Sequence, residues 1–353
     1  MSSPRVVALG ELLLRLKSPG RERLMQSGRL EATFGGAEAN VAATLASDGI
    51  DCAFVSALTN NPLGDAAIGE LRRFGIDASN VVREAGRLGT YYLEAGAGQR
   101  SGRVVYDREN SVFANVAPIP LNWSRCFEGA TWLHVSGITP ALSESAATIC
   151  LDAVTGAQKL RLTVSCDYNF RDTLWRYGKN PPDVMRAIVE QVHVGVAGRG
   201  DCQTMLGIIP KHAERDGALN VEWYRVLAEQ ASNAFPNLDL QVITLREGNS
   251  ATNNGWAGCL HNRKEFLVSK RYEIADVVDH VGAGHSFTVG LIYALIQKKS
   301  AQYALEFATA ARCRKHTIVG DVNRVSAAEV EALMGGQGGG RMQRQEIDCD
   351  FAR

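Results

Sequence analysis

The sequence lacks the features that mark several large classes of protein. Its 38 Lys and Arg residues balance 38 Asp and Glu residues, and this balance argues against a nucleic-acid or membrane-surface binder. No apolar run approaches the roughly 18 residues that a membrane span requires. The N-terminal stretch MSSPRVVALGELLLRL has polar and charged residues where a signal peptide has an apolar core. We therefore expect a cytoplasmic protein with no nucleic-acid partner and no membrane partner.

Close cysteine pairs are also missing. The eight cysteines are scattered singly, with no C-x-x-C, so their spacing suggests neither a metal site nor a redox site. In a chain of 353 residues, 45% of them hydrophobic, the scattered cysteines favour reduced, mostly buried thiols. The same length allows one large α/β domain or two.

What the sequence does contain is an alternation of strand-like and helix-like segments. We expect strands at residues 5–10, 52–58, 131–137, 161–169, 193–198 and 240–247. Helices are expected between and after them at 35–49, 64–75, 143–157, 185–192, 221–235, 285–296 and 301–313. This alternation predicts an α/β fold with a central, mostly parallel sheet and helices on both faces.

Three segments depart from the alternation. GTYYLEAG and RVVYDREN, joined by a glycine-containing turn, predict a β-hairpin within residues 89–111, which we expect to form a small lid. A second hairpin is expected at residues 256–274. GGQGGGR predicts a glycine-rich C-terminal tail over residues 335–353. The domain expectation is therefore one domain at 1–334, including the lid, followed by the tail.

Two glycine turns open helices. VGAGHSF (Val281–Phe287) is neither a Walker loop nor a dinucleotide fingerprint, but backbone N–H groups at such a helix start favour an anion. FGGAEAN places Glu38 and Asn40 near the first turn of the earlier helix. Each turn alone is equally consistent with a tight helix start and no ligand. Two such turns, both following strand structure, favour a shared cleft at the carboxyl edge of the sheet.

Polar residues follow other strands. Asp167, Asn169 and Arg171 alternate in CDYNFRDTLW and would share one face if extended. An arginine at a strand end suits a carboxylate or phosphate, although a surface salt bridge is the usual alternative. Tyr106 and Arg108 lie on the lid hairpin, and TLREGNSATNN suits the ribose and phosphates of a nucleotide or is a simple loop.

Together these residues resemble the ribokinase-type (PfkB-like) carbohydrate kinases over about the first 330 positions. The family's early Gly-Gly-x-x-x-Asn is matched by Gly35, Gly36 and Asn40. Its late D-x-x-G-A-G-D-x-F-x-x-G is matched at Asp279, Gly282, Ala283, Gly284, Phe287 and Gly290. Within the family, GELLLRL, YDR, NFRDTLW and TLREGNS are most similar to 2-keto-3-deoxygluconate kinases.

The resemblance implies a ribokinase-like fold with a β lid, through which the chain would form a homodimer or a higher homo-oligomer. It implies transfer of the ATP γ-phosphate, with Mg²⁺, to the terminal hydroxyl of a small-molecule sugar acid. The sugar acid would be bound by Gly35, Gly36, Asn40, Tyr91, Tyr106, Arg108, Asn169 and Arg171. The nucleotide would be bound by Thr244, Arg246, Gly248, Gly282 and Gly284, and catalysis would involve Gly282, Ala283, Gly284 and the residue after them, His285.

The sequence departs from the family pattern at two positions. The family has an aspartate after Gly-Ala-Gly, which takes the proton from the attacking hydroxyl, and here this residue is His285. In VGVAGRGDCQ, Gly198 replaces the asparagine of an Asn-x-x-Glu pattern, while Asp201 can stand for the acid as a metal ligand. A general base contributes about 10²–10⁴ in rate, so a poorer base predicts a slow kinase rather than an inactive one.

Three alternatives stay open on the sequence. The chain is a sugar-acid kinase that uses His285 or water as base, a non-catalytic relative that binds sugar acid or nucleotide, or an otherwise ordinary kinase with an altered catalytic residue. A neutral-sugar kinase of the fructose or ribose class is the competing specificity. A neutral sugar has no carboxylate, so a kinase of that class would not need Arg171 to bind its substrate.

Overall fold

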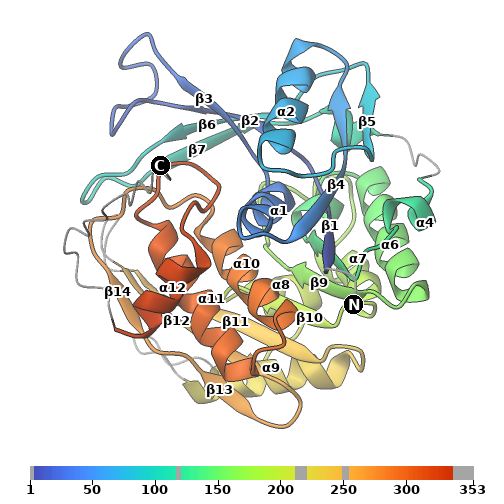
Figure 1. Cartoon of the computed structure of the whole chain (residues 1–353), viewed down its shortest axis with the longest axis vertical. Helices are drawn as coiled ribbons and strands as arrows, with labels where there is room; N and C mark the ends of the chain where they lie inside the picture. The colour runs from blue at the N-terminus through green and yellow to red at the C-terminus, as the bar shows by residue number, and fades with distance from the viewer. Residues whose placement is uncertain (1–3, 117–120, 211–220, 249–253, 337–353) are drawn as a thin grey trace, which may run out of the picture.

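A large sheet forms the centre of the molecule. The structure is a computed structural model that describes residues 4–116, 121–210, 221–248 and 254–336. The strands of the large sheet are β1 (Arg5–Leu9), β4 (Asp51–Thr59), β5 (Val81–Glu84), β8 (Trp132–Ser136), β9 (Thr163–Asp167), β10 (Val194–Ala197), β11 (Leu240–Gly248), β12 (Asn254–His261), β13 (Phe266–Val268) and β14 (Tyr272–Ile274). Their order is β13-β12-β11-β10-β9-β8-β1-β4-β5, with β14 beside β12 (Figure 1).

The sheet is parallel from β5 to β11 and antiparallel from β11 to β13. In β1, Val6 and Ala8 face one hydrophobic core while Val7 and Leu9 face the other. Strands that are buried on both faces are apolar throughout, which is why RVVAL shows no polar alternation. The predicted α/β class with a mostly parallel sheet is confirmed.

Helices cover both faces of this sheet (Figure 1). One face carries α1 (Ala37–Ser47), α2 (Pro62–Arg73), α10 (Ala283–Ile296), α11 (Ala301–Lys315) and α12 (Ala327–Met334). The other carries α3 (Val112–Asn115), α4 (Trp123–Cys126), α5 (Ile138–Ala141), α6 (Glu144–Lys159), α7 (Pro181–Val189), α8 (Asp201–Leu206) and α9 (Val221–Ala234). Helices α1 and α10 contact each other, so the two glycine turns that open them lie at one end of the molecule.

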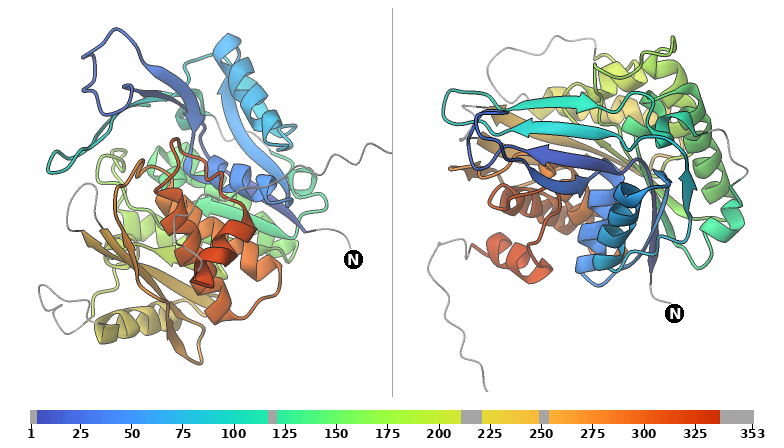
Figure 2. Two further views of the ribbon diagram at one scale, coloured as in Figure 1. Left: turned by 60° about the vertical axis from the view of Figure 1, so that its left-hand side comes forward. Right: turned by 90° about the horizontal axis from the view of Figure 1, so that it is seen from above.

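A second, smaller sheet forms the lid. Its strands are β2 (Leu13–Lys17), β3 (Glu31–Gly35), β6 (Thr90–Glu94) and β7 (Arg103–Asp107), in the order β3-β2-β6-β7. The β6–β7 hairpin falls within the range expected for it, whereas β2 and β3 were not expected from the sequence. Strand β3 is largely exposed and carries no clear apolar alternation. Figure 2 shows the lid strands lying apart from the large sheet.

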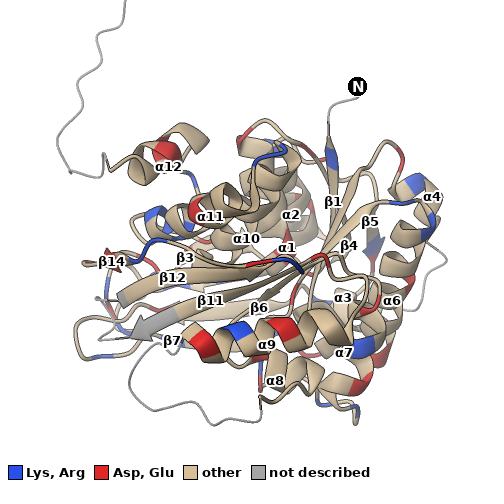
Figure 3. Cartoon of the chain, turned by 90° about the horizontal axis from the view of Figure 1, so that it is seen from below, with Lys and Arg blue, Asp and Glu red and all other residues tan. Residues whose placement is uncertain are grey.

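The surface mixes both signs of charge. Lys, Arg, Asp and Glu are interspersed along helices such as α9 in the view of Figure 3. Within the described ranges, no helix is both long enough and apolar enough to span a membrane.

Candidate active site

The two glycine turns meet in space. Nδ2 of Asn40 on α1 lies 3.0 Å from Nδ1 of His285 on α10. A Cβ atom added to Gly35 would lie 2.1 Å from Oδ2 of Asp321, and one added to Gly282 would lie 1.9 Å from the backbone oxygen of Asp321. Both turns therefore close on the same residue, which lies between α11 and α12.

The glycines of these turns have different roles. Gly282 precedes α10 with φ of 81°, a left-handed conformation that favours glycine. Gly36 is extended, but a Cβ there would lie 2.1 Å from the backbone oxygen of Glu11. A Cβ on Gly284 would meet no atom within 4 Å. Gly282 and Gly36 are thus required by packing, whereas Gly284 borders open space at the N-terminus of α10.

His285 is a neutral side chain in this setting. It is half-buried in the first turn of α10. Burial, together with the positive charges of Arg171, Lys315 and Arg312 and with nearby His134, lowers the pKa of His285 to about 3. The imidazole therefore stays uncharged across the physiological pH range.

A buried ionic cluster lies beneath the turns. Arg15 on β2 pairs with Asp279 at 2.6 Å and also with Asp321, and the hydroxyl of Tyr91 on β6 donates to Asp321. Burial raises the pKa of Asp279, but Arg15 and Lys315 outweigh burial and hold it below its ordinary value. Burial lowers the pKa of Lys315 to about 8. The cluster joins the lid to the turn that opens α10.

Sequence reasoning missed Arg15, Lys315 and Asp321. One signal for Arg15 was present, because a lone arginine interrupts the apolar run LLLRL, and a buried arginine needs carboxylate partners. Asp321 lies in an unremarkable loop, and its partners are distant in the chain, so no local pattern indicated its role.

Of the three lid residues expected to bind the substrate, Tyr91 and Arg108 are buried and Tyr106 is exposed. Tyr91 is buried, and its hydroxyl is engaged with Asp321 rather than open to the cleft. Tyr106 is 45% exposed, and its ring lies 5.8 Å from that of Tyr91. Arg108 is buried, and its Nε donates to Glu11 at 2.9 Å, with its guanidinium 5.8 Å from the Tyr106 ring. Glu11, which sequence reasoning did not consider, therefore holds Arg108 at the base of the lid.

The expected common face of Asp167, Asn169 and Arg171 is wrong. Strand β9 ends at Asp167, and Asn169 adopts a left-handed φ of 40°, so the chain turns instead of continuing extended. Arg171 is exposed, and its Nη1 donates to the backbone oxygen of Phe170 at 2.8 Å. Its charge nevertheless helps to lower the pKa of His285 and opposes the rise that burial causes in the pKa of Asp167.

Two carboxylates lie at the ends of β9 and β10. Asp167 is buried, and burial, helped by Asp201, raises its pKa to about 7. Asp201 accepts backbone N–H groups of Gly198 at 2.5 Å and Phe170 at 3.3 Å. A Cβ at Gly198 would lie 3.0 Å from Oδ2 of Asp201. Asp201 thus holds the loop that follows β10, and the described residues contain no cluster of three or more acidic, His or Cys metal ligands.

The expected nucleotide residues lie at the same edge of the sheet. The Thr244 hydroxyl on β11 donates to the backbone oxygen of Ala197 on β10 at 3.3 Å. Gly248 and Arg246 lie on the same strand, and the side chain of Arg246 falls outside the described residues.

Glu38 is not the exposed first-turn charge that a helix cap would provide. It is buried, and its Oε1 accepts hydrogen bonds from the hydroxyls of Ser136 at 2.6 Å and Thr139 at 2.9 Å. Burial raises the pKa of Glu38 above its ordinary value. This network ties α1 to the end of β8 and so positions Asn40.

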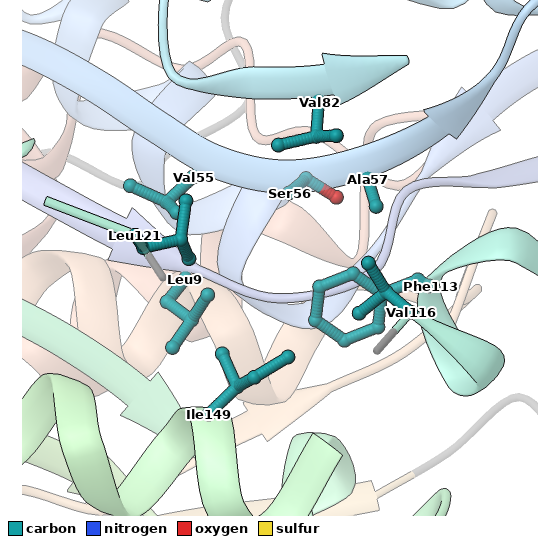
Figure 4. Close-up of a pocket in the computed structure, with 9 residues that line it drawn as sticks. All are labelled: Leu9, Val55, Ser56, Ala57, Val82, Phe113, Val116, Leu121 and Ile149. Atoms are coloured by element: carbon teal, nitrogen blue, oxygen red, sulfur yellow. The ribbon is translucent and has the colours of Figure 1, made fainter. Parts of the chain in front are cut away.

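A separate apolar pocket lies on the opposite face of the sheet (Figure 4). Its lining is aliphatic and aromatic except for one serine: Leu9, Val55, Ser56, Ala57, Val82, Phe113, Val116, Leu121 and Ile149. None of the described residues that line it is charged, so they offer no means of holding phosphates or a sugar acid.

Comparison with known proteins agrees with this geometry. The family model of the pfkB family carbohydrate kinases matches residues 3–313. The chain therefore belongs to this family. A 2-dehydro-3-deoxygalactonokinase of Haloferax volcanii is 30% identical over 95% of this chain and 98% of its own. A 2-dehydro-3-deoxygluconokinase of Thermoproteus tenax is 28% identical over 93% of this chain and 94% of its own.

Solved structures show the same likeness. A crystal structure of 2-dehydro-3-deoxygluconokinase from Thermotoga maritima superposes with a TM-score of 0.88 at 42% identity, covering 94% of this chain and 100% of that one. The predicted family, the ribokinase-like fold and the enzyme class are confirmed. The chain is a sugar kinase, with ATP as a substrate and a small-molecule sugar as acceptor.

Proposed function

We propose that this kinase phosphorylates a sugar acid of the 2-keto-3-deoxygluconate type at its terminal hydroxyl. The observation that carries the proposal is the exposed guanidinium of Arg171, whose charge acts on His285 and which forms no ion pair with a carboxylate in the described part of the chain. Arginine forks suit a carboxylate. The names of the relatives, which act on 2-dehydro-3-deoxy sugar acids, support the same acceptor.

We propose that Gly284 and the first turn of α10 receive the phosphates, because the space beside Gly284 is open and helix N-termini attract anions. Thr244, Arg246 and Gly248 would line the rest of the nucleotide. The sugar acid would lie between Gly35, Gly36 and Asn40 on one side and Tyr106, Arg108, Asn169 and Arg171 on the other, with Tyr91 beneath.

The carboxylates fit a magnesium ion that arrives with ATP. Magnesium is usually bound through one or two carboxylates plus substrate phosphates. Asp167 is the better candidate, because its buried carboxylate lies near Asp201 and has a raised pKa that a cation would relieve. Both oxygens of Asp201 already accept backbone N–H groups, so Asp201 would orient the loop. The ion would neutralise charge on the phosphates.

We also propose a homodimer formed through the lid. Strand β7 is exposed along its whole length, and Val104 and Val105 are 39% and 45% exposed. Apolar side chains on an unpaired edge strand favour pairing with another chain.

The test is ATP-dependent phosphorylation of 2-keto-3-deoxygluconate by this chain and by His285→Asp, with magnesium. We expect slow turnover by the present chain and a gain of about 10²–10⁴ for His285→Asp, the range of a general base. The Asn40 amide can donate to one oxygen of the new carboxylate and leave the other to accept the hydroxyl proton.

Two results would contradict this expectation. Fast turnover without any gain in the Asp variant would mean that His285 already supports full catalysis. Sugar-acid binding by both proteins, detected as a raised melting temperature, without turnover by either would favour a non-catalytic binding protein.

A further inference from the structure

The hydrogen bond between Asn40 and His285 has a direction that the surrounding atoms determine. The backbone N–H of Gly36 points at Oδ1 of Asn40, 3.3 Å away. A backbone N–H can only donate, so the amide atom facing it has to be the oxygen. The NH₂ group of Asn40 is therefore the atom that faces Nδ1 of His285 at 3.0 Å.

An amide NH₂ group is a donor only, so Nδ1 of His285 has to accept. In a neutral imidazole one nitrogen accepts and the other carries the proton. The proton of His285 is then on Nε2. Reversing the Asn40 amide would set two donors against each other at Gly36, so the hydrogen bonds are satisfied together in one arrangement only.

This tautomer is poorly suited to general-base catalysis. Nε2 already carries a proton and has no lone pair to receive another, while Nδ1 is occupied by Asn40. The positive charges around the ring also oppose protonation of His285. Arg312 and Lys315 on α11 and Arg171 after β9 all disfavour a second proton, and His134 on β8 offers no negative charge.

We propose that Asn40 holds His285 as the Nε2–H tautomer, and that this N–H donates to an oxygen of the phosphoryl group during transfer. This inference rests on the proposed kinase function. The bond from phosphorus to the leaving ADP oxygen breaks as the bond to the sugar oxygen forms. The hydroxyl proton passes to a phosphoryl oxygen and then to water instead of to His285. His285 is thus an electrostatic catalyst, and Asn40 is its positioning residue.

Phosphoryl transfer can proceed when a hydrogen-bond donor replaces the general base. Its transition state is loose, and catalysis depends mainly on positioning and on charge stabilisation. A donor that is already in place stabilises charge on the phosphoryl oxygens, and removing one such donor typically costs about 10²–10³ in rate. A Cβ added to Gly284, the residue before His285, would meet no atom within 4 Å, so the N-terminus of α10 borders open space that a phosphoryl group would need.

The tautomer can be read directly by ¹⁵N NMR of histidine-labelled protein. Protonated and unprotonated ring nitrogens resonate in separate regions, and His285→Gln identifies the His285 signals. We expect Nε2 protonated and Nδ1 unprotonated. A protonated Nδ1 with a bare Nε2 would overturn the proposal.

Asn40→Asp is the matched variant for this measurement. A carboxylate can still accept from Gly36 N–H but cannot donate, so it should move the ring proton to Nδ1. An unchanged tautomer in this variant would show that Asn40 does not control the ring and would overturn the positioning role.

Turnover then tests the donor role. Gln places an amide N–H close to the position of Nε2 but cannot take a proton, whereas Leu fills similar space without a donor. We expect kcat of His285→Gln to stay within about tenfold of the unchanged chain, and that of His285→Leu to fall at least about a hundredfold. Equal losses in the two variants would overturn the donor role.

The two proposals fail separately. If no variant phosphorylates the sugar acid, the proposed function is wrong, and the NMR spectra still decide the tautomer. Addition of the ATP analogue AMP-PNP with magnesium should shift the Nε2–H signal when the phosphates arrive. An Nε2–H signal that does not move with saturating AMP-PNP would contradict donation to a phosphoryl oxygen.

Discussion

The exposed guanidinium of Arg171 distinguishes the two classes of acceptor that the fold can accommodate. Its charge acts on His285 and on Asp167, but within the described residues it forms no ion pair with a carboxylate, and its Nη1 donates to the backbone oxygen of Phe170. A sugar acid brings a carboxylate to such a group, whereas fructose or ribose does not.

We expect Arg171→Leu to raise KM for the sugar acid by about 10- to 100-fold, because a hydrogen bond to a charged group contributes about 1.5–3 kcal/mol. Arg176→Leu, an exposed arginine in the same segment, is the control and should leave KM unchanged. Steady-state kinetics with the acid and with a neutral sugar decide the matter. An unchanged KM in Arg171→Leu would favour the neutral-sugar kinase.

At the scale of the element, the turn that opens α10 combines a packing requirement with an open binding surface. Gly282 is left-handed and lies against the backbone of Asp321, while two residues later Gly284 faces empty space. The same glycine-rich stretch therefore contains one position that the fold needs and one that a ligand needs.

Substituting each glycine by alanine separates these roles. Gly282→Ala should lower the free energy of unfolding by at least about 2 kcal/mol, because it adds backbone strain to a clash with Asp321. Gly284→Ala should leave that free energy within about 1 kcal/mol or raise it, as alanine favours a helix, yet it should reduce kinase activity. Urea unfolding followed by circular dichroism gives the first result. Equal destabilisation by both substitutions would contradict the assignment of Gly282 to packing and Gly284 to ligand binding.

The lid is joined by charge to the turn that opens α10. Arg15 on β2 and Tyr91 on β6 both reach Asp321, and Arg15 also reaches Asp279 just before the α10 turn. Buried ion pairs of this kind contribute little net stability but are costly to break singly. The cluster thus fixes the position of the lid strands relative to the glycine turns.

At the scale of the whole molecule, the buried thiols determine how stability responds to alkaline pH. Burial raises the pKa of Cys52 and of Cys259 to about 12, and that of Cys313 to about 11. Unfolded thiols ionise near pH 8.5. Above that pH the folded state holds more protons than the unfolded state, so stability falls as pH rises. Lys315, whose pKa is lowered, acts in the opposite direction, but it is a single group.

We expect the free energy of unfolding to decline from pH 8.5 to 10.5, with each buried thiol contributing up to about 1.4 kcal/mol per pH unit. Cys259→Ala should make the decline shallower by that amount. Thr309→Ala, a buried but non-ionising control, should lower stability without changing the slope. Urea titrations in reductant at several pH values measure this, and a slope unaffected by Cys259→Ala would contradict the account.

Local sequence patterns were enough to predict the α/β class, most strands of the large sheet, and the two glycine turns. These depend on local patterns, namely apolar strand segments, helix periodicity and the backbone freedom of glycine, which a single stretch of chain displays. The family resemblance also followed from local motifs. The Asp167–Arg171 interpretation failed because periodicity alone does not show where a strand ends, and a left-handed Asn169 ended this one.

The groups that surround the Asn40–His285 pair are brought together by folding and could not be read from any single stretch of the sequence. Asn40 and His285 are 245 positions apart, and Arg15 and Asp321 are 306 apart, so no local pattern connects them. Hydrogen-bond direction and pKa depend on the atoms that folding brings together. The residue at position 285 could be read from the sequence, whereas the nitrogen that carries its proton depends on a contact that exists only in the folded chain.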